Sequence, residues 1–315
     1  MSLVIASQME EAFNEGLRAH GSRPTVIPAP ETAPWQVAGE ADVILVRPSP
    51  IWRSRRDAQR PQEWPGRIRW VYSASAGVDA YPRWLLDAPL VSCGRGVSSE
   101  EIADYVLAAI YLQEKNLDAL RVTGPDQWRS VPLGRVAGST VGIVGLGAIG
   151  AAVARRALAA GARVTAIRRR TLPSPVPGVD LLDDIHAVAA SADHLVLALP
   201  GTEATRHLVG RSVLAHARPT AHLINVGRGS VLDQEALIEA LDEGRLGQAT
   251  LDVTEPEPLP PGHPLWTHPR VRLTPHVSSN HQRVRDLLFE RVSRNLTRFL
   301  SGEGPGDLVD PVAGY

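Results

Sequence analysis

A segment of six residues that follows a run of apolar side chains has the spacing of a phosphate-binding loop. Gly145, Gly147 and Gly150 form a G-x-G-x-x-G pattern between the apolar run VGIVG and the helical pattern AAVARRALAA. The first glycine allows a tight turn, the second lets backbone N–H groups approach a pyrophosphate, and the third lets the helix pack on the strand. The helix start, with Ala148 and Ile149, then presents unpaired N–H donors to the anion. We therefore expect these five residues to bind a dinucleotide.

Three arginines stand where a residue that reads the ribose is expected, about 20 positions after such a loop. They are Arg168, Arg169 and Arg170, and no acidic residue accompanies them. A carboxylate here would accept hydrogen bonds from the ribose of NAD and repel a 2′-phosphate, whereas guanidinium groups bind that phosphate. The sequence therefore favours NADP(H), bound by Arg168 and Arg169, with NAD(H) as the second choice. The alternative interpretation is a solvated basic loop.

Three further motifs carry an arginine, a glutamate and a histidine, and each follows a predicted strand. The motifs span residues 225–229, 251–258 and 274–277, and they contain Arg228, Glu257 and His276. Each has an ordinary explanation by itself, as a surface charge, a turn or a helix cap. Open α/β sheets bind ligands at the carboxyl ends of their strands, so the shared position of the motifs favours one common site.

The elements that must position these motifs are apolar runs that alternate with amphipathic stretches. Such alternation is typical of parallel strands buried on both faces, and it predicts a Rossmann-type doubly wound sheet. A helix is expected over QEALIEALDEG, with Asp233 as N-cap and Gly244 as left-handed C-cap. The predicted strands are VGIVG (141–145), RVTAI (163–167), HLVLAL (194–199), HLINV (222–226), ATLDV (249–253) and VRLT (271–274).

The first hundred residues repeat this alternation more weakly, which predicts a second α/β unit. A long helix over residues 100–116 carries the chain into the stronger unit, and the last helical pattern, about 281–300, returns to the first. We expect one domain of residues 1–98 completed by 281–315, and another of residues 99–280. The strands predicted in the first are LVIA (3–6), DVILV (42–46), IRWVYS (68–73) and LVSC (90–93).

Composition argues against several other classes of protein. Lys+Arg 33 nearly cancels Asp+Glu 34, so no basic field points to nucleic acid or acidic membranes. No run approaches the roughly 18 apolar residues of a membrane span, and the start of the chain lacks a basic signal region, so we expect a cytoplasmic protein. The single cysteine, Cys93, cannot form an intrachain disulfide and is interpreted as buried filler.

In this order, the glycine loop and the three motifs resemble the D-isomer-specific 2-hydroxyacid dehydrogenase family over roughly residues 95–279. The spacing inside the block that starts at Val131, and the PLPP stretch at residues 258–261, are most similar to the glyoxylate/hydroxypyruvate reductase branch. The resemblance implies a Rossmann-type dinucleotide-binding domain (99–280) and a smaller flavodoxin-like α/β substrate domain (1–98 with 281–315). It also implies an NAD(P)-dependent oxidoreductase that interconverts a small 2-oxo acid and its D-2-hydroxy acid.

The resemblance assigns catalytic roles by matching position. Arg228 matches the arginine that holds the substrate carboxylate and 2-oxo oxygen, a two-point contact that suits a forked guanidinium. His276 matches the proton donor and acceptor, and Glu257 matches the carboxylate that pairs with it and favours the imidazolium. We prefer Glu257 to Glu255 because the family's acidic residue is the one in the final Glu-Pro pair.

Binding contacts are carried over in the same way. Asp252 matches a residue near the nicotinamide carboxamide, and Pro200 and Thr205 match the loop that lines the two riboses. Val226 and Gly227, beside Arg228, complete the expected cofactor contacts.

In the first unit, Ala76 and Gly77 lie in a loop that resembles the family segment whose backbone N–H groups bind the substrate carboxylate. Arg47 resembles a second carboxylate contact found in some members. The alternative for the loop is an ordinary turn made easy by Gly77. This half of the chain matches the family least, so the physiological acid is left open. Asp104 also departs from the family, which commonly has glutamate there.

Two rival classes can be separated from an enzyme of this kind. A dinucleotide-sensing interaction protein of the same fold would not consume NADPH with 2-oxo acids. A metal hydrolase would need His263, His268, His276 and His281, whose spacings fit no H-E-x-x-H site, so no metal is expected. The resemblance implies a homodimer, with the helix from Glu100 and the 121–137 loop as its interface.

Overall fold

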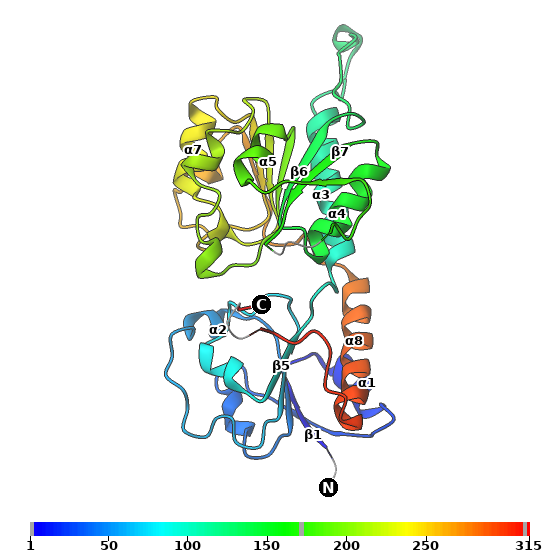
Figure 1. The fold of residues 1–315 in the computed structure, drawn as a ribbon, viewed down its shortest axis with the longest axis vertical. Helices are drawn as coiled ribbons and strands as arrows, with labels where there is room; N and C mark the ends of the chain where they lie inside the picture. The colour runs from blue at the N-terminus through cyan, green and yellow to red at the C-terminus, as the bar shows by residue number, and fades with distance from the viewer. Residues whose placement is uncertain (1–2, 170–172, 311–313) are drawn as a thin grey trace. The chain divides into compact units, whose positions relative to one another are not determined.

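The computed structural model describes residues 3–169, 173–310 and 314–315. The chain forms two compact units, which are unit 1 (Met1–Ser98 with His281–Tyr315) and unit 2 (Ser99–Asn280) (Figure 1). Each unit has one parallel sheet with helices on its faces, which confirms the α/β class. Within the described ranges, no helix is long and apolar enough to cross a lipid bilayer.

Unit 1 is built on a five-stranded parallel sheet with the order β2-β1-β3-β4-β5. This is the flavodoxin-like order, as the family resemblance implied. β3 and β4 are buried along their whole length, because helices or loops cover both faces of an inner parallel strand. The strands are β1 (Val4–Ser7), β2 (Thr25–Pro28), β3 (Val43–Val46), β4 (Trp70–Ser73) and β5 (Leu90–Cys93).

Two distant segments cover one face of this sheet. The helices α1 (Glu11–Arg18) and α8 (Gln282–Ser301) share an apolar cluster, in which the rings of Phe13 and Phe289 meet edge to face at 5.3 Å. The other face is covered by α2 (Pro50–Ser54), the 3-10 helices η1 (Pro34–Val37) and η2 (Arg83–Asp87), and a cluster of tryptophans. Cys93 is fully buried, which raises the pKa of its thiol and confirms that it is core filler.

Unit 2 contains a seven-stranded parallel sheet with the order β12-β11-β10-β9-β6-β7-β8. The order reverses between β6 and β9, which is the switch point where doubly wound sheets bind ligands. The expected Rossmann-type sheet is therefore confirmed. The strands are β6 (Thr140–Val144), β7 (Arg163–Ile167), β8 (Val179–Leu181), β9 (His194–Leu197), β10 (His222–Asn225), β11 (Gln248–Leu251) and β12 (Val271–Leu273).

The helices of unit 2 form two layers, one on each face of its sheet. The layer of α3 (Ser99–Lys115) and α4 (Ala148–Ala159) shares one apolar cluster, and that of α5 (Ile185–Ser191), α6 (Arg211–Leu214) and α7 (Gln234–Asp242) shares another. The predicted caps of α7 are confirmed, since Asp233 accepts a hydrogen bond from the N–H of Ala236 and Gly244 has φ 70°. Short 3-10 helices are η3 (Pro125–Gln127), η4 (Glu203–Thr205), η5 (Gly229–Val231) and η6 (Pro264–Trp266).

The strands β2 and β8 were not expected from the sequence. Both lie at an edge of their sheet, and both are short and partly exposed, so neither carries the continuous apolar run of an inner strand. β2 also ends in Pro28, which cannot donate a ladder hydrogen bond and is tolerated at an edge.

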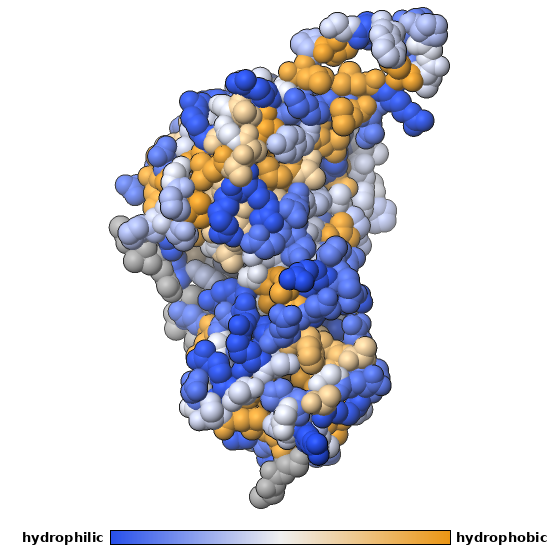
Figure 2. Space-filling model, turned by 90° about the vertical axis from the view of Figure 1, so that its right-hand side faces the viewer, coloured by the Kyte–Doolittle hydropathy of each residue, from blue (hydrophilic) through white to orange (hydrophobic). Residues whose placement is uncertain are grey.

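The segment between α3 and β6 extends away from the body of unit 2 (Figure 1). We call residues 116–135 the arm. Hydrophobic surface gathers on it (Figure 2), and the apolar side chains exposed there are Leu117, Val122, Trp128, Val131 and Leu133.

Candidate functional site

The glycine loop joins β6 to α4 at the carboxyl edge of the unit 2 sheet. Gly145 has φ 104° and donates its N–H to the carbonyl of Ile167 at 3.0 Å, a turn that disfavours any side chain. A Cβ on Gly150 would collide with the carbonyl oxygen of Gly145, whereas a Cβ on Gly147 would meet nothing within 4 Å. Gly147 and Ala148 are exposed at the start of α4. The loop therefore has the tight turn, the open approach and the close helix packing that a pyrophosphate cradle requires.

The arginines follow β7 at the same edge. Arg168 is half-buried and donates from Nη1 to the carbonyl of Pro173 at 3.0 Å, while Arg169 is exposed. Arg170 lies outside the described residues. Two guanidinium groups thus lie next to the end of the second strand of the βαβ unit, where ribose contacts are made in this fold.

Glu257 and His276 are brought together by the loops that follow β11 and β12. The Nδ1 of His276 lies 3.0 Å from Oε2 of Glu257. A carboxylate can only accept, so Nδ1 carries the hydrogen and Nε2 faces away from the pair. The other oxygen of Glu257 accepts from the N–H of Thr254 at 3.2 Å. Glu255 instead forms an ion pair with Arg206, with Nη1 and Oε1 2.9 Å apart.

The backbone around His276 is held by Asp252, which is 2% exposed. One carboxylate oxygen accepts from the N–H of Val277 at 2.9 Å, and the other accepts from the N–H of Ser278 at 3.0 Å. The N–H of His276 donates to the carbonyl of Asp252 at 2.9 Å. His276 itself has φ 54°, a left-handed conformation that a non-glycine residue keeps only when its surroundings hold it. The contacts described for the Asp252 carboxylate are thus with the histidine loop, and its expected contact with the nicotinamide stays a prediction.

Arg228 lies in the loop after β10, and that loop packs directly against the one that carries Glu257. The side chain of Asn225 donates to the carbonyl of Arg228 at 3.0 Å and accepts from the N–H of Gly227 at 3.1 Å. A Cβ on Gly229 would overlap the backbone of Thr254. The two loops therefore meet without room for a side chain at that position.

The remaining residues expected to contact the cofactor lie at the same carboxyl edge. Thr205 donates from its hydroxyl to the carbonyl of Pro200 at 2.7 Å and accepts from the N–H of Thr202 at 2.9 Å, which fixes the loop after β9. Val226 is buried directly after β10. All the site residues predicted in unit 2 thus follow the ends of its strands.

The substrate-binding residues predicted in unit 1 also follow strand ends. Arg47 comes after β3 and forms an ion pair with Glu31, with Nη2 and Oε1 2.5 Å apart and both side chains about half exposed. Ala76 and Gly77 come after β4, and the hydroxyl of Ser75 donates to the carbonyl of Gly77 at 2.5 Å. Sequence reasoning did not identify Glu31, because its proline-rich surroundings carry no periodic signal.

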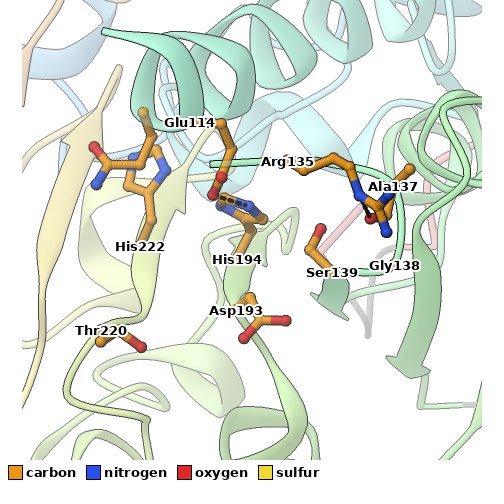
Figure 3. Close-up of a pocket in the computed structure, with 10 residues that line it drawn as sticks. Glu114, Arg135, Ala137, Gly138, Ser139, Asp193, His194, Thr220 and His222 are labelled. Atoms are coloured by element: carbon orange, nitrogen blue, oxygen red, sulfur yellow. Dashed lines mark hydrogen bonds and ion pairs between the residues drawn. The ribbon is translucent and has the colours of Figure 1, made fainter. Parts of the chain in front are cut away.

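A cavity of about 420 Å³ lies at the opposite, amino edge of the unit 2 sheet. His194 and His222, the first residues of β9 and β10, line it together with Glu114 from α3 (Figure 3). It is separated from the glycine loop by the length of the strands and is not part of the site described above.

Comparison with known proteins gives a consistent result. The family model described as "D-isomer specific 2-hydroxyacid dehydrogenase, NAD binding domain" matches residues 109–278. A relative named glyoxylate/hydroxypyruvate reductase A, from Serratia proteamaculans, is 30% identical over 303 residues, which cover 92% of this chain and 93% of the relative.

Two solved structures cover the whole chain. A D-isomer specific 2-hydroxyacid dehydrogenase from Xanthobacter autotrophicus, in complex with NADPH and MES, is 28% identical and matches with a TM-score of 0.83, covering 100% of both chains. An NADPH-dependent glyoxylate/hydroxypyruvate reductase from Sinorhizobium meliloti, in complex with NADP and sulfate, is also 28% identical, with a TM-score of 0.79 and 100% coverage of both chains.

Proposed function

The chain belongs to the D-isomer-specific 2-hydroxyacid dehydrogenase family, and from that premise we propose that it interconverts a small 2-oxo acid and its D-2-hydroxy acid with a nicotinamide cofactor. The observation that carries the proposal is the 3.0 Å contact between His276 Nδ1 and Glu257 Oε2, at the sheet edge that also holds the glycine loop. Glyoxylate and hydroxypyruvate are the proposed substrates, because relatives bear their names. A cytoplasmic location stays a prediction.

The roles of this chain's own residues follow from their chemistry. The bound nicotinamide supplies or accepts the hydride. Glu257 accepts the hydrogen on Nδ1 of His276 and thereby orients the ring. His276 then holds a second proton on Nε2, which it delivers to the substrate oxygen during reduction and removes during oxidation. Catalysis here is orientation together with stabilisation of the developing charge.

Arg228 is proposed to bind the substrate carboxylate and the 2-oxo oxygen. Its planar guanidinium offers a fork of donors that matches such a two-point contact better than an ammonium group would. The packed loops after β10 and β11 support this role, because they fix the backbone on either side of the arginine and the glutamate. Contributions from Arg47, Ala76 and Gly77 stay predictions from the resemblance.

The proposal is tested by replacing the histidine. We expect His276→Ala to lower kcat for reduction of glyoxylate and hydroxypyruvate by about a hundredfold to ten-thousandfold, the usual range for loss of a general acid. NADPH affinity should stay nearly unchanged, because the variant leaves the glycine loop intact. His216→Ala, at an exposed position of unit 2, is the control. Wild-type protein that does not consume NADPH with any 2-oxo acid would instead favour the dinucleotide-sensing alternative.

We also propose that NADP(H) is the preferred cofactor. The support is the pair Arg168 and Arg169 at the end of β7, and the NADP(H) that the two structural relatives contain. If each arginine makes a charge-assisted contact with the 2′-phosphate, the pair favours NADPH by about two to four orders of magnitude, toward the low end because exposed charges are screened.

The cofactor proposal is tested by measuring kcat/KM for NADPH and NADH at one ionic strength. Arg168→Asp combined with Arg169→Ser should raise KM for NADPH steeply and leave NADH kinetics equal or better. Arg294→Asp, on the exposed side of α8, reproduces two of the three units of charge that the double variant changes and so controls for most of the change in net charge. Wild-type preference for NADH would show that the arginines form only a solvated loop.

A homodimer formed through the arm and α3 is the proposed assembly. Trp128 is 82% and Leu117 is 67% exposed, and apolar side chains gathered on a projecting segment are typical of an interface (Figure 2). Trp128→Asp should raise the dimer Kd by about 30-fold or more, measured by sedimentation equilibrium. Trp266→Asp changes an exposed tryptophan of the same unit outside the arm and should leave the Kd unchanged. A monomeric wild-type protein at micromolar concentration would contradict the assembly.

A further inference from the structure

A chain of side-chain hydrogen bonds runs from α3 to the loop that carries His276. The hydroxyl oxygens of Tyr105 and Thr274 are 2.6 Å apart, and the Thr274 hydroxyl lies 2.6 Å from a carboxylate oxygen of Asp252. The same carboxylate accepts from the N–H groups of Val277 and Ser278, at 2.9 Å and 3.0 Å. Every member belongs to unit 2.

The direction of this chain follows from the number of hydrogens available. The Asp252 carboxylate can only accept, so the single hydrogen of the Thr274 hydroxyl is given to it. Thr274 therefore has only lone pairs left for its other neighbour, and Tyr105 must donate. Partial burial raises the pKa of Tyr105, which keeps the phenol protonated and able to donate.

The hydrogen-bond chain ends at the backbone around His276, which has an unfavourable left-handed conformation. His276 has φ 54°, and its own N–H is bound to the carbonyl of Asp252. Because the Asp252 carboxylate holds the two following N–H groups, any loosening of that carboxylate releases the segment on which the imidazole is mounted. Tyr105 comes from α3, whose neighbouring residues Ala103 and Val106 are fully buried, so its hydroxyl is delivered from a rigid part of the core.

We propose that Tyr105 is a positioning residue for His276, acting through Thr274 and Asp252 to hold the histidine in the orientation that proton transfer requires. This inference rests on the proposed function of His276. Neither Tyr105 nor Thr274 touches the reacting atoms in this scheme. Their contribution is to the placement of the proton donor, so it should affect turnover more than binding of either ligand.

The test compares Tyr105→Phe with Tyr111→Phe, the same change at an exposed position of the same helix. Tyr105→Phe should lower kcat for 2-oxo acid reduction by roughly 5-fold to 30-fold, the effect of one lost hydrogen bond in a buried network, with KM and the NADPH Kd within about twofold. Tyr111→Phe should match the wild type. A loss of NADPH affinity and thermal stability that parallels the loss of kcat would indicate a merely structural role and overturn the proposal.

A second pair of variants tests the route through Thr274. Thr274→Val keeps the shape of the side chain and removes the hydroxyl, whereas Thr274→Ser keeps the hydroxyl and should recover most of the activity that Val loses. Because Tyr105 and Thr274 act in one chain, the double variant Tyr105→Phe/Thr274→Val should be no slower than Thr274→Val alone within about twofold. Multiplicative effects would show that the two residues act independently.

Hydrogen exchange gives a readout that does not depend on turnover. In Tyr105→Phe, the amides of Val277 and Ser278 should exchange at least about threefold faster than in the wild type, while those of β6 should not change. Unchanged exchange at both amides overturns the inference whatever the substrate assay shows. Absence of turnover in the wild type, by contrast, contradicts the proposed function alone.

Discussion

At the scale of single residues, the site depends on how each polar group is partnered. Glu257 divides its two oxygens between the N–H of Thr254 and the ring of His276. The loop therefore fixes the orientation of the Glu257 carboxylate, and the carboxylate in turn orients the ring of His276. Glu255, two residues away, forms an ion pair with Arg206. The same dipeptide repeat thus places one glutamate at the histidine and the other in a salt bridge that holds the loop.

The charge on Glu257 should be visible in the rate of the reaction. Glu257→Gln keeps the size and a hydrogen-bond acceptor but removes the negative charge that faces the ring of His276. We expect kcat for reduction to fall by roughly tenfold, because the ring is held less well for proton transfer. Steady-state kinetics measures this loss.

Glu255→Gln is the matched control, because it neutralises a neighbouring carboxylate that contacts Arg206 instead of His276. Its kcat should match that of the wild type. If instead Glu255→Gln lowers kcat and Glu257→Gln does not, the pairing inferred from the 3.0 Å contact has no part in proton transfer.

At the scale of elements, the site consists of loops that follow parallel strands and are locked to one another. The loop after β10 meets the loop after β11 at Gly229, and the loop after β12 is tied to the end of β11 through Asp252. The strands bring these loops to one edge, and the contacts between loops set the relative positions of arginine, glutamate and histidine. The glycines of the site are therefore positions of contact as much as positions of flexibility.

Gly229 is the most direct test of this packing. A methyl group there would overlap the backbone of Thr254, and its neighbours are main chain that cannot rotate aside. We expect Gly229→Ala to lower the free energy of unfolding by about 1–3 kcal/mol and kcat/KM by more than tenfold, because the loops must separate. Gly39→Ala is the control, since a Cβ there meets nothing within 4 Å. An active, fully stable Gly229→Ala protein would show that the loops after β10 and β11 do not pack against each other at this position.

The inner strands and the motifs at their ends could be predicted from the sequence, but the connections between motifs could not. Inner parallel strands are buried on both faces and so leave continuous apolar runs, as in VILV of β3. Edge strands such as β8 leave no such run. The bond from Tyr105 to Thr274 joins residues 169 positions apart, and no local pattern in the sequence marks such a partner. Such long-range hydrogen bonds are therefore visible only in the three-dimensional structure.

At the scale of the whole molecule, the unit 2 sheet has edges of opposite character. Its carboxyl edge carries exposed groups suited to ligands, whereas its amino edge buries His194 and His222, each 1% exposed, in neighbouring strands. His222 donates to or accepts from the hydroxyl of Thr250 through Nε2, while its Nδ1 has no hydrogen-bond partner among the described residues. Such groups are uncharged when folded and make the stability of the molecule depend on pH.

Burial, with smaller contributions from His194 and Arg272, lowers the pKa of His222 to about 3. Burial also lowers the pKa of His194, although Glu114 opposes this. An unfolded histidine takes up a proton below about pH 6.5. Between that pH and about 3, the unfolded chain therefore binds a proton that the folded chain excludes at His222, and stability is lost as the pH falls. From pH 7 to pH 5 this group alone should remove about 2 kcal/mol from the free energy of unfolding.

His222 lies in unit 2, so unfolding is followed with two probes that respond differently to the two units. Five of the seven tryptophans lie in unit 1, so tryptophan fluorescence follows mainly that unit, whereas far-UV circular dichroism follows both. Urea unfolding at pH 7 and pH 5 should show the acid-induced loss by circular dichroism in the wild type and in His216→Gln, an exposed control. In His222→Gln, which has no ring to protonate, the loss should shrink by about 2 kcal/mol, even if the variant is less stable at both pH values. If His222→Gln loses as much free energy of unfolding between pH 7 and pH 5 as the wild type, groups other than His222 cause the acid sensitivity. A destabilisation by the substitution that is the same at both pH values does not affect this comparison.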